Sequence, residues 1–219
     1  MAQLESSFKN MLVVLTTIAL FAALTLGSVY QLTKGPIEAS KLAKQENAIK
    51  DVLPAFDRLD AGFQVKLDGM TDSFTVYKAY KLKQFVGAAV QTYSNNGFSG
   101  QIKLMVGFDQ SGNIVNYTVL EQKETPGLGT KMVDWFKTDK AAQSIIGLNG
   151  ANNNLTVSKD GGEVDAITAS TISSRAFLEA VRFAYTAYTN QEDGTTSATS
   201  TDGEVNVKNE KSDGGQNNE

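Results

Sequence analysis

The chain has 219 residues, a formal net charge of −4, and neither cysteine nor histidine. These missing side chains exclude disulfide frameworks, thiolate or imidazole metal sites, and nucleophilic catalysis with a histidine base. We therefore expect no catalytic residue and no metal site, and any redox activity should come from a bound cofactor. The charge pattern contains no basic stripe, which argues against nucleic-acid binding.

Residues 11–30, after a short segment 1–10, predict a single transmembrane helix. The stretch MLVVLTTIALFAALTLGSV (11–29) has no charged residue, and as a helix it would span roughly 28 Å, close to the hydrocarbon thickness of a bilayer. Its hydroxyl groups can bond back within a helix. A cleaved signal peptide is the alternative, but the run is long, its amino-terminal flank has only Lys9, and no good cleavage site follows.

Lysines give only weak information on which side of the membrane the body lies. One precedes the span, whereas Lys34, Lys41, Lys44 and Lys50 follow it closely, which weakly places the body in the cytoplasm by the positive-inside rule. That rule is poor for long translocated domains. Composition alone therefore leaves the side open.

Residues 31–188 predict one α+β domain. Pro36 begins an expected helix over 36–53, and period-two patterns then predict five strands at 63–67, 74–82, 85–93, 101–108 and 113–122, with a hairpin turn at 109–113. A helix over 131–146, a strand over 154–158 and a closing helix over 173–188 follow. Short turns between strands imply a mostly antiparallel sheet with flanking helices.

Residues 189–219 predict a disordered acidic tail. They contain seven acidic residues, two lysines and no aromatic residue. Such a segment cannot bury enough apolar surface to offset the entropy of ordering it.

The stretch VDAITASTISSRAF (164–177) joins a strand-like run to a helix through small hydroxylated residues. A helix that begins there would direct free backbone N–H groups and the positive end of its dipole at one point, which suits phosphate. Arg175 could add a positive charge. The simpler interpretation is a polar helix cap, because serine and threonine are preferred at helix starts.

The segment DAITASTISS (165–174) resembles the D-x-x-[ST]-G-A-T-x-[ST]-S signature of the covalent FMN-binding domain. This domain occurs in the G subunit of the Rnf-type ferredoxin:NAD oxidoreductase and in the C subunit of the sodium-pumping NADH:quinone oxidoreductase. The resemblance implies that a flavin transferase joins FMN through its phosphate to Thr171. Asp165, Thr168 and Ser173 match other signature positions, whereas Ala169 stands where glycine is usual. Ser170 stands where alanine is usual and offers a competing hydroxyl.

Two further stretches resemble the same family, in the same order along the chain. TYSNNGFSGQI (92–102) is similar to its Y-x-G-F-G-G-x-I segment, and ETPGLGTK (124–131) to its E-T-P-G-L-G loop. The loop should contain a type II turn at Pro126–Gly127 and leave backbone uncovered for a flat ring. Its expected cofactor-binding residues are Glu124, Thr125, Gly127, Leu128, Gly129 and Lys131.

Four aromatic residues are candidate neighbours of the flavin, with ordinary core packing as the alternative for each. They are Tyr93, Phe98, Trp135 and Phe136. Lys131 and Arg175 could balance phosphate or flavin charge.

The resemblance implies an electron-transfer subunit with covalent FMN in an ion-translocating Rnf complex, with no independent reaction of its own. Its expected partners are other membrane subunits, the flavin transferase and membrane lipid. It would be a single-pass protein of the inner (plasma) membrane, with its domain on the extracytoplasmic side. The alternatives are a C-type subunit of the quinone reductase, or a membrane-anchored binding or assembly module without flavin.

Overall fold

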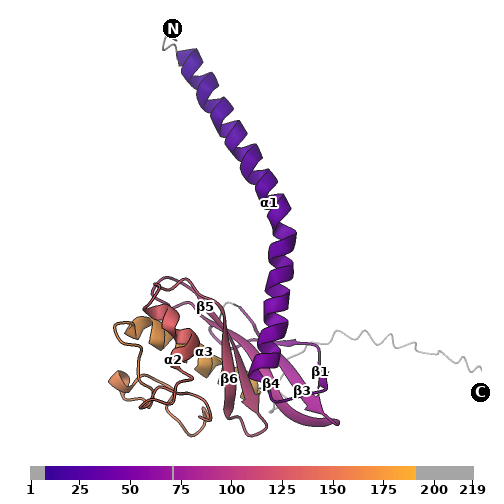
Figure 1. The fold of residues 1–219 in the computed structure, drawn as a ribbon, viewed down its shortest axis with the longest axis vertical. Helices are drawn as coiled ribbons and strands as arrows, with labels where there is room; N and C mark the ends of the chain where they lie inside the picture. Colours follow the sequence, from indigo (N-terminus) through magenta and orange to yellow (C-terminus); the bar gives the residue numbers. More distant parts are fainter. Residues whose placement is uncertain (1–7, 71, 191–219) are drawn as a thin grey trace, which may run out of the picture.

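The computed structural model describes residues 8–70 and 72–190, which form a long helix and a sheet domain (Figure 1). The predicted tail lies almost entirely outside the described residues, as does most of the segment 1–10. The elements in chain order are α1 (Phe8–Val52), β1 (Arg58–Leu59), β2 (Phe63–Val65), β3 (Phe74–Lys81), β4 (Gln84–Ser94), β5 (Ile102–Asp109), β6 (Ile114–Glu121), η1 (Gly129–Lys131), α2 (Met132–Trp135), η2 (Ser158–Asp160) and α3 (Thr171–Asn190).

α1 is a single helix of 45 residues in which the predicted span and the predicted helix over 36–53 are continuous. The prediction that Pro36 begins a helix is wrong, because Pro36 lies in the helix interior. Proline there removes the hydrogen bond to the carbonyl of Leu32. Gly35 has no Cβ to clash with the proline ring, and Leu32 is exposed. The helix therefore continues through Pro36.

The amino-terminal part of α1 is long and apolar enough to cross a membrane, and none of its most apolar 18-residue window is buried in the domain. The hydroxyl groups of Thr16, Thr17, Thr25 and Ser28 each donate to the carbonyl four residues earlier, at 2.8 Å. The expectation that these hydroxyls bond back within the helix is confirmed.

The sheet has the order β1-β3-β4-β5-β6, with β2 also paired to β3, and every pairing is antiparallel. This confirms the predicted α+β fold with a mostly antiparallel sheet. The five predicted strands correspond to β2 through β6. The predicted hairpin turn is also present, where the Asp109 carboxylate accepts from the N–H groups of Ser111 and Asn113.

Two predictions of elements after β6 are wrong, the helix over 131–146 and the strand over 154–158. The predicted helix over 131–146 is limited to the single turn of α2. The chain turns back after Trp135, and the N–H of Ile145 bonds to the carbonyl of Phe136 at 3.0 Å, which buries Ile145. In place of the predicted strand over 154–158, the structure has one isolated bridge, between Val157 and Val164.

The strand residues alternate between two faces of the sheet. Val90, Val106 and Phe108 belong to the large core formed with α3. Ala89 and Met105 belong to a smaller cluster, formed with the last turns of α1. The closing helix was predicted over 173–188, and α3 extends it by two residues at each end.

Candidate functional site

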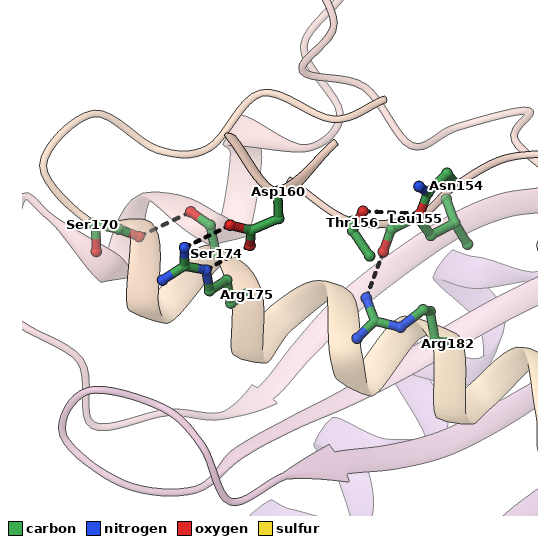
Figure 2. A network of polar contacts seen from close by, with 8 residues as sticks. All are labelled: Asn154, Leu155, Thr156, Asp160, Ser170, Ser174, Arg175 and Arg182. Carbon is green, nitrogen blue, oxygen red and sulfur yellow. Dashed lines mark hydrogen bonds and ion pairs between the residues drawn. The ribbon is translucent and has the colours of Figure 1, made fainter. Parts of the chain in front are cut away.

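The turn that leads into α3 is held by the hydroxyl of Ser174. This hydroxyl donates to the carbonyl of Ser170 and accepts from the N–H of Ile167, both at 2.9 Å. The first of these bonds is visible in Figure 2. Ala169 has φ +61°, so the left-handed backbone that favours glycine forms here with alanine, at a cost of roughly 1–2 kcal/mol.

Thr171 is the first residue of α3 and is partly buried. The N–H of Ser174 bonds to the carbonyl of Ser170 at 3.1 Å, which is the first bond of the helical ladder. The N–H groups of Thr171, Ile172 and Ser173 come before this bond and have no carbonyl partner within the helix. Together with the helix dipole, they favour an anion beside Thr171.

Arg175 does not point its charge into this anion site. Its guanidinium forms two bonds of 2.7 Å with the carboxylate of Asp160, on the outer side of α3 (Figure 2). The guanidinium that was expected to balance phosphate charge is therefore paired with the Asp160 carboxylate in this structure.

The loop 124–131 forms the second wall of the site. The N–H of Leu128 bonds to the carbonyl of Thr125 at 3.1 Å, across Pro126 and Gly127, and Gly127 has φ +76°. These are the features of the predicted type II turn. The hydroxyl of Thr130 accepts from the N–H of Gly127 at 2.9 Å and so tightens the loop.

Glu124 connects this loop to α3 although its side chain is buried, with 4% exposure. Oε2 accepts from the hydroxyl of Ser173 at 2.5 Å, and Oε1 accepts from the N–H of Ser99 at 3.0 Å. The hydroxyl of Ser170 in turn lies 2.9 Å from that of Ser173. Because a buried carboxylate is stable only with donors around it, Glu124 fixes the three segments against one another.

Two glycines make room for this carboxylate. A Cβ on Gly129 would lie 2.7 Å from both the Cβ of Glu124 and the Oγ of Ser173. A Cβ on Gly97 would lie 2.8 Å from Oε1 of Glu124. Gly129, expected to leave backbone uncovered for a ring, thus also has a packing role under Glu124.

The two walls enclose a pocket of about 340 Å³. Its lining combines hydroxyls, the buried carboxylate and apolar side chains: Phe98, Glu124, Thr125, Leu128, Gly129, Ala169, Ser170, Thr171, Ile172 and Ser173. Phe98, Leu128 and Ile172 are 67%, 39% and 48% exposed. The pocket therefore combines the start of α3 with uncovered apolar surface, which fits a phosphate joined to a flat ring.

Most of the predicted site residues meet at this pocket. Those that line it are Glu124, Thr125, Leu128, Gly129, Ser170, Thr171 and Ser173. Thr168, Gly127 and Lys131 are exposed beside it without lining it. Asp165 points elsewhere, since its carboxylate accepts from the hydroxyl of Ser158 at 2.9 Å.

Of the four candidate flavin neighbours, only Phe98 lines the pocket. Tyr93 stacks on Phe74 and Phe136 stacks on Phe177 in the core. The indole N–H of Trp135 donates to the backbone carbonyl of Asp165 at 2.9 Å. The lining residue Ile172 was not predicted, although it lies inside the quoted signature segment, because an apolar side chain there carried no chemical signal.

Glu124 is the one carboxylate among the residues that line the pocket, and the other polar side chains there are hydroxyls. In the described residues 8–70 and 72–190, no three carboxylates or other ligating side chains are grouped to hold a metal ion. The phenol of Tyr117 is buried in the core, where burial raises its pKa far above the usual range, and it donates to the carbonyl of Met132 at 2.6 Å. The pocket can hold an anion and present a hydroxyl to it.

Comparisons with known proteins agree with this geometry. Residues 97–186, which contain every pocket residue, match the family model of the FMN-binding domain. Curated relatives named as the G subunit of the ion-translocating oxidoreductase complex are similar over most of the chain. The protein from Yersinia pestis is 36% identical over 180 residues, covering 76% of this chain and 84% of its own. The proteins from Vibrio vulnificus and Escherichia coli K12 are 33% and 34% identical, each over 76% of this chain and over 83% and 85% of their own.

Proposed function

Because the chain belongs to the family of G subunits of ion-translocating oxidoreductase complexes, we propose that it is the membrane-anchored electron-transfer subunit of such a complex and carries FMN bound covalently to Thr171. It takes part in the redox reaction of the complex as an electron carrier and has no separate reaction of its own. The observation that carries the proposal is the position of Thr171, at the first residue of α3 inside the pocket.

Attachment is a phosphoryl transfer from a flavin nucleotide with a pyrophosphate bond, delivered by a flavin transferase. The Oγ1 of Thr171 forms a bond to the flavin phosphorus, the pyrophosphate P–O bond breaks, and a nucleoside monophosphate leaves with the hydroxyl proton. The free N–H groups at the start of α3 bind the phosphate oxygens. The side chains need only orient the hydroxyl and the phosphate.

Noncovalent contacts must then fix the ring, because a phosphoester holds only one end of the cofactor. Bound FMN supplies the ability to accept and donate electrons. Phe98, Leu128 and Ile172 offer exposed apolar surface at the pocket. These side chains would cover the ring and exclude water from one face of it.

The apolar part of α1 would anchor the chain as one uncleaved span, with residues 31–219 on the extracytoplasmic side. The length and composition of the helix support the anchor, as does the continuity of α1 into the domain.

The mass of the mature chain tests the attachment. We expect the unmodified chain plus one FMN less one water, and flavin absorbance that persists after denaturation. Thr171→Ala should abolish both. The matched control is Thr186→Ala, which removes an exposed threonine of α3 that does not line the pocket and should leave the added mass intact.

A bare chain mass from cells that contain the flavin transferase would refute the covalent proposal. Such a result would favour a membrane-anchored module without flavin. Retained flavin in Thr171→Ala would instead show that another residue is the acceptor.

Cysteine labelling tests the orientation, because the chain has no cysteine of its own. A cysteine at exposed Lys140 should react with a membrane-impermeant maleimide in intact spheroplasts. Labelling only after the membrane is opened would reverse the proposed orientation.

A further inference from the structure

Two adjacent hydroxyls line the pocket, on Ser170 and Thr171. Both are alcohols that can attack phosphorus, and serine is the less hindered of the two. The proposed attachment at Thr171 therefore requires something that keeps Ser170 from reacting.

The hydrogen bonds around Glu124 have a fixed direction. A carboxylate only accepts, so Ser173 must donate its single hydroxyl proton to Glu124, at 2.5 Å. The bond between Ser170 and Ser173, at 2.9 Å, can then only be donated by Ser170. The proton of Ser170 is therefore directed toward Ser173, which is 1% exposed.

Burial reinforces this arrangement. Glu124 is 4% exposed, Ser173 is 1% exposed and Ser170 is 9% exposed. If the Ser170 side chain turned toward a phosphorus atom in the pocket, it would leave this chain of hydrogen bonds. Leaving it would deprive a buried hydroxyl of its acceptor, which is costly.

The hydroxyl of Thr171 is outside this chain. Thr171 lines the same pocket and is more exposed than Ser170. Among the described residues, no hydrogen-bond partner holds its Oγ1. Its hydroxyl can turn toward a phosphate held at the start of α3.

We propose that Glu124, acting through Ser173, determines the site of flavin attachment by holding the Ser170 hydroxyl inward and leaving Thr171 as the sole acceptor. Glu124 is thus a positioning residue that sets specificity between neighbouring hydroxyls. This inference rests on the proposed covalent attachment, and the reaction at either hydroxyl is the phosphoryl transfer described above.

The test removes the preferred acceptor and then releases the other one. The full chain would be produced with the flavin transferase, and the flavin located by tandem mass spectrometry of the peptide containing residues 164–175. Thr171→Ala alone should carry flavin only at the background level of the measurement. Adding Ser173→Ala removes the acceptor of Ser170, and adding Glu124→Gln places an amide donor where the carboxylate was. Either double variant should carry flavin on Ser170, with occupancy raised about tenfold or more over Thr171→Ala.

Glu179→Gln is the matched control in the Thr171→Ala background. Glu179 accepts from the hydroxyl of Ser94 at the same 2.5 Å distance, but it does not line the pocket. This variant should leave Ser170 without flavin. Near-ultraviolet circular dichroism of each variant would establish folding. The two double variants free the Ser170 hydroxyl in different ways, so the test still stands if one of them does not fold.

The outcomes separate this inference from the proposed function. A wild-type chain without flavin on Thr171 would refute the proposed function itself. With flavin present on wild-type Thr171, flavin on Ser170 in the Thr171→Ala single variant would overturn the inference, because the hydrogen-bond chain would then activate Ser170 or fail to hold it. Folded double variants without flavin on Ser170 would overturn it as well.

Discussion

The two faces of the sheet are packed in different ways. On one face, α3 lies along β4 and β5 and forms a continuous core that includes Phe108, Phe177 and Tyr188. On the other face, the last turns of α1 pack on the sheet, and the smaller cluster there includes Ala48, Ala89 and Met105. Beyond them lies an open groove of about 1270 Å³ between α1 and the sheet.

The candidate site belongs to the tightly packed face. Its pocket is built on the first turn of α3, and the core beneath that helix fixes the helix on the sheet. The α1 face instead connects the domain to the apolar span, through the packing of the last turns of α1 on the sheet. Changes on the α3 face should therefore reach the site, whereas changes on the α1 face should leave it intact.

The largest effect is expected from Phe177→Ala on the α3 face. Phe177 stacks on Phe136 with ring centroids 4.3 Å apart and meets Tyr117 edge-on at 4.8 Å. Loss of this buried ring should lower the free energy of unfolding by about 3–5 kcal/mol, measured by urea unfolding in detergent. Ile172→Ala, at an exposed position of the same helix, should change it by less than about 0.5 kcal/mol. Equal effects of the two variants would contradict the comparison.

On the α1 face, Gly107→Val should have a smaller and local effect. A Cβ on Gly107 would overlap the backbone carbonyl of Val52, so α1 must move away from β5, at about 1–3 kcal/mol. Hydrogen exchange should become faster at residues 48–53 and stay unchanged at residues 167–174. Faster exchange in the second segment would mean that the two faces are coupled.

Tyr117→Phe should cost about 1 kcal/mol, because it removes the hydrogen bond to the carbonyl of Met132. Burial raises the pKa of Tyr117, so the folded chain holds this proton more tightly than the unfolded chain does. Above about pH 10, where an unfolded tyrosine ionises, stability should fall as the pH rises. Unfolding measured between pH 9 and 11 should show a shallower fall in Tyr117→Phe, and an identical fall would refute the assignment.

The smallest effect is expected at the exposed pair of Asp160 and Arg175. The hydrogen bonds from Arg175 lower the pKa of Asp160. A lowered pKa in the folded state stabilises the chain above the unfolded pKa, near 3.9, and this stabilisation is lost as the pH falls through the folded pKa. Asp160→Asn should flatten that part of the acid unfolding profile, and roughly 1 M salt should reduce the difference. A difference that persists in salt would argue for a buried interaction.

The sheet could be predicted from the sequence because its strands follow one another through short turns. The period-two patterns at 74–82, 85–93 and 101–108 correspond closely to β3, β4 and β5. The apolar residues after β6 gave a misleading signal. Ile145 is buried as a helical pattern would require, but it is placed by a turn back to Phe136, which local periodicity does not reveal.

The candidate site could be predicted only in pieces. The segments 124–131 and 165–174 were each recognisable, but nothing in the sequence indicated that Glu124 and Ser173 meet at 2.5 Å across 49 residues. A buried glutamate has no local signature, since its burial depends on glycines at 97 and 129 that leave space for it. Pro36 was also misinterpreted, because proline favours a helix start and only tertiary structure shows the helix continuing through it.

The continuity of α1 sets the height of the pocket above the apolar span. Residues 31–47 are helical and largely exposed, and at 1.5 Å per residue this part of the helix is about 25 Å long. The distance of a redox group in the domain from the apolar span is therefore fixed by a rigid helix. A flexible linker would instead allow a wide range of distances. Pro36 lies near the end of this segment that adjoins the apolar span. A change of ~20° in the direction of the helix axis at Pro36 would move the domain end of α1 by roughly 8 Å. Electron exchange with a neighbour would thus depend on the angle of one helix.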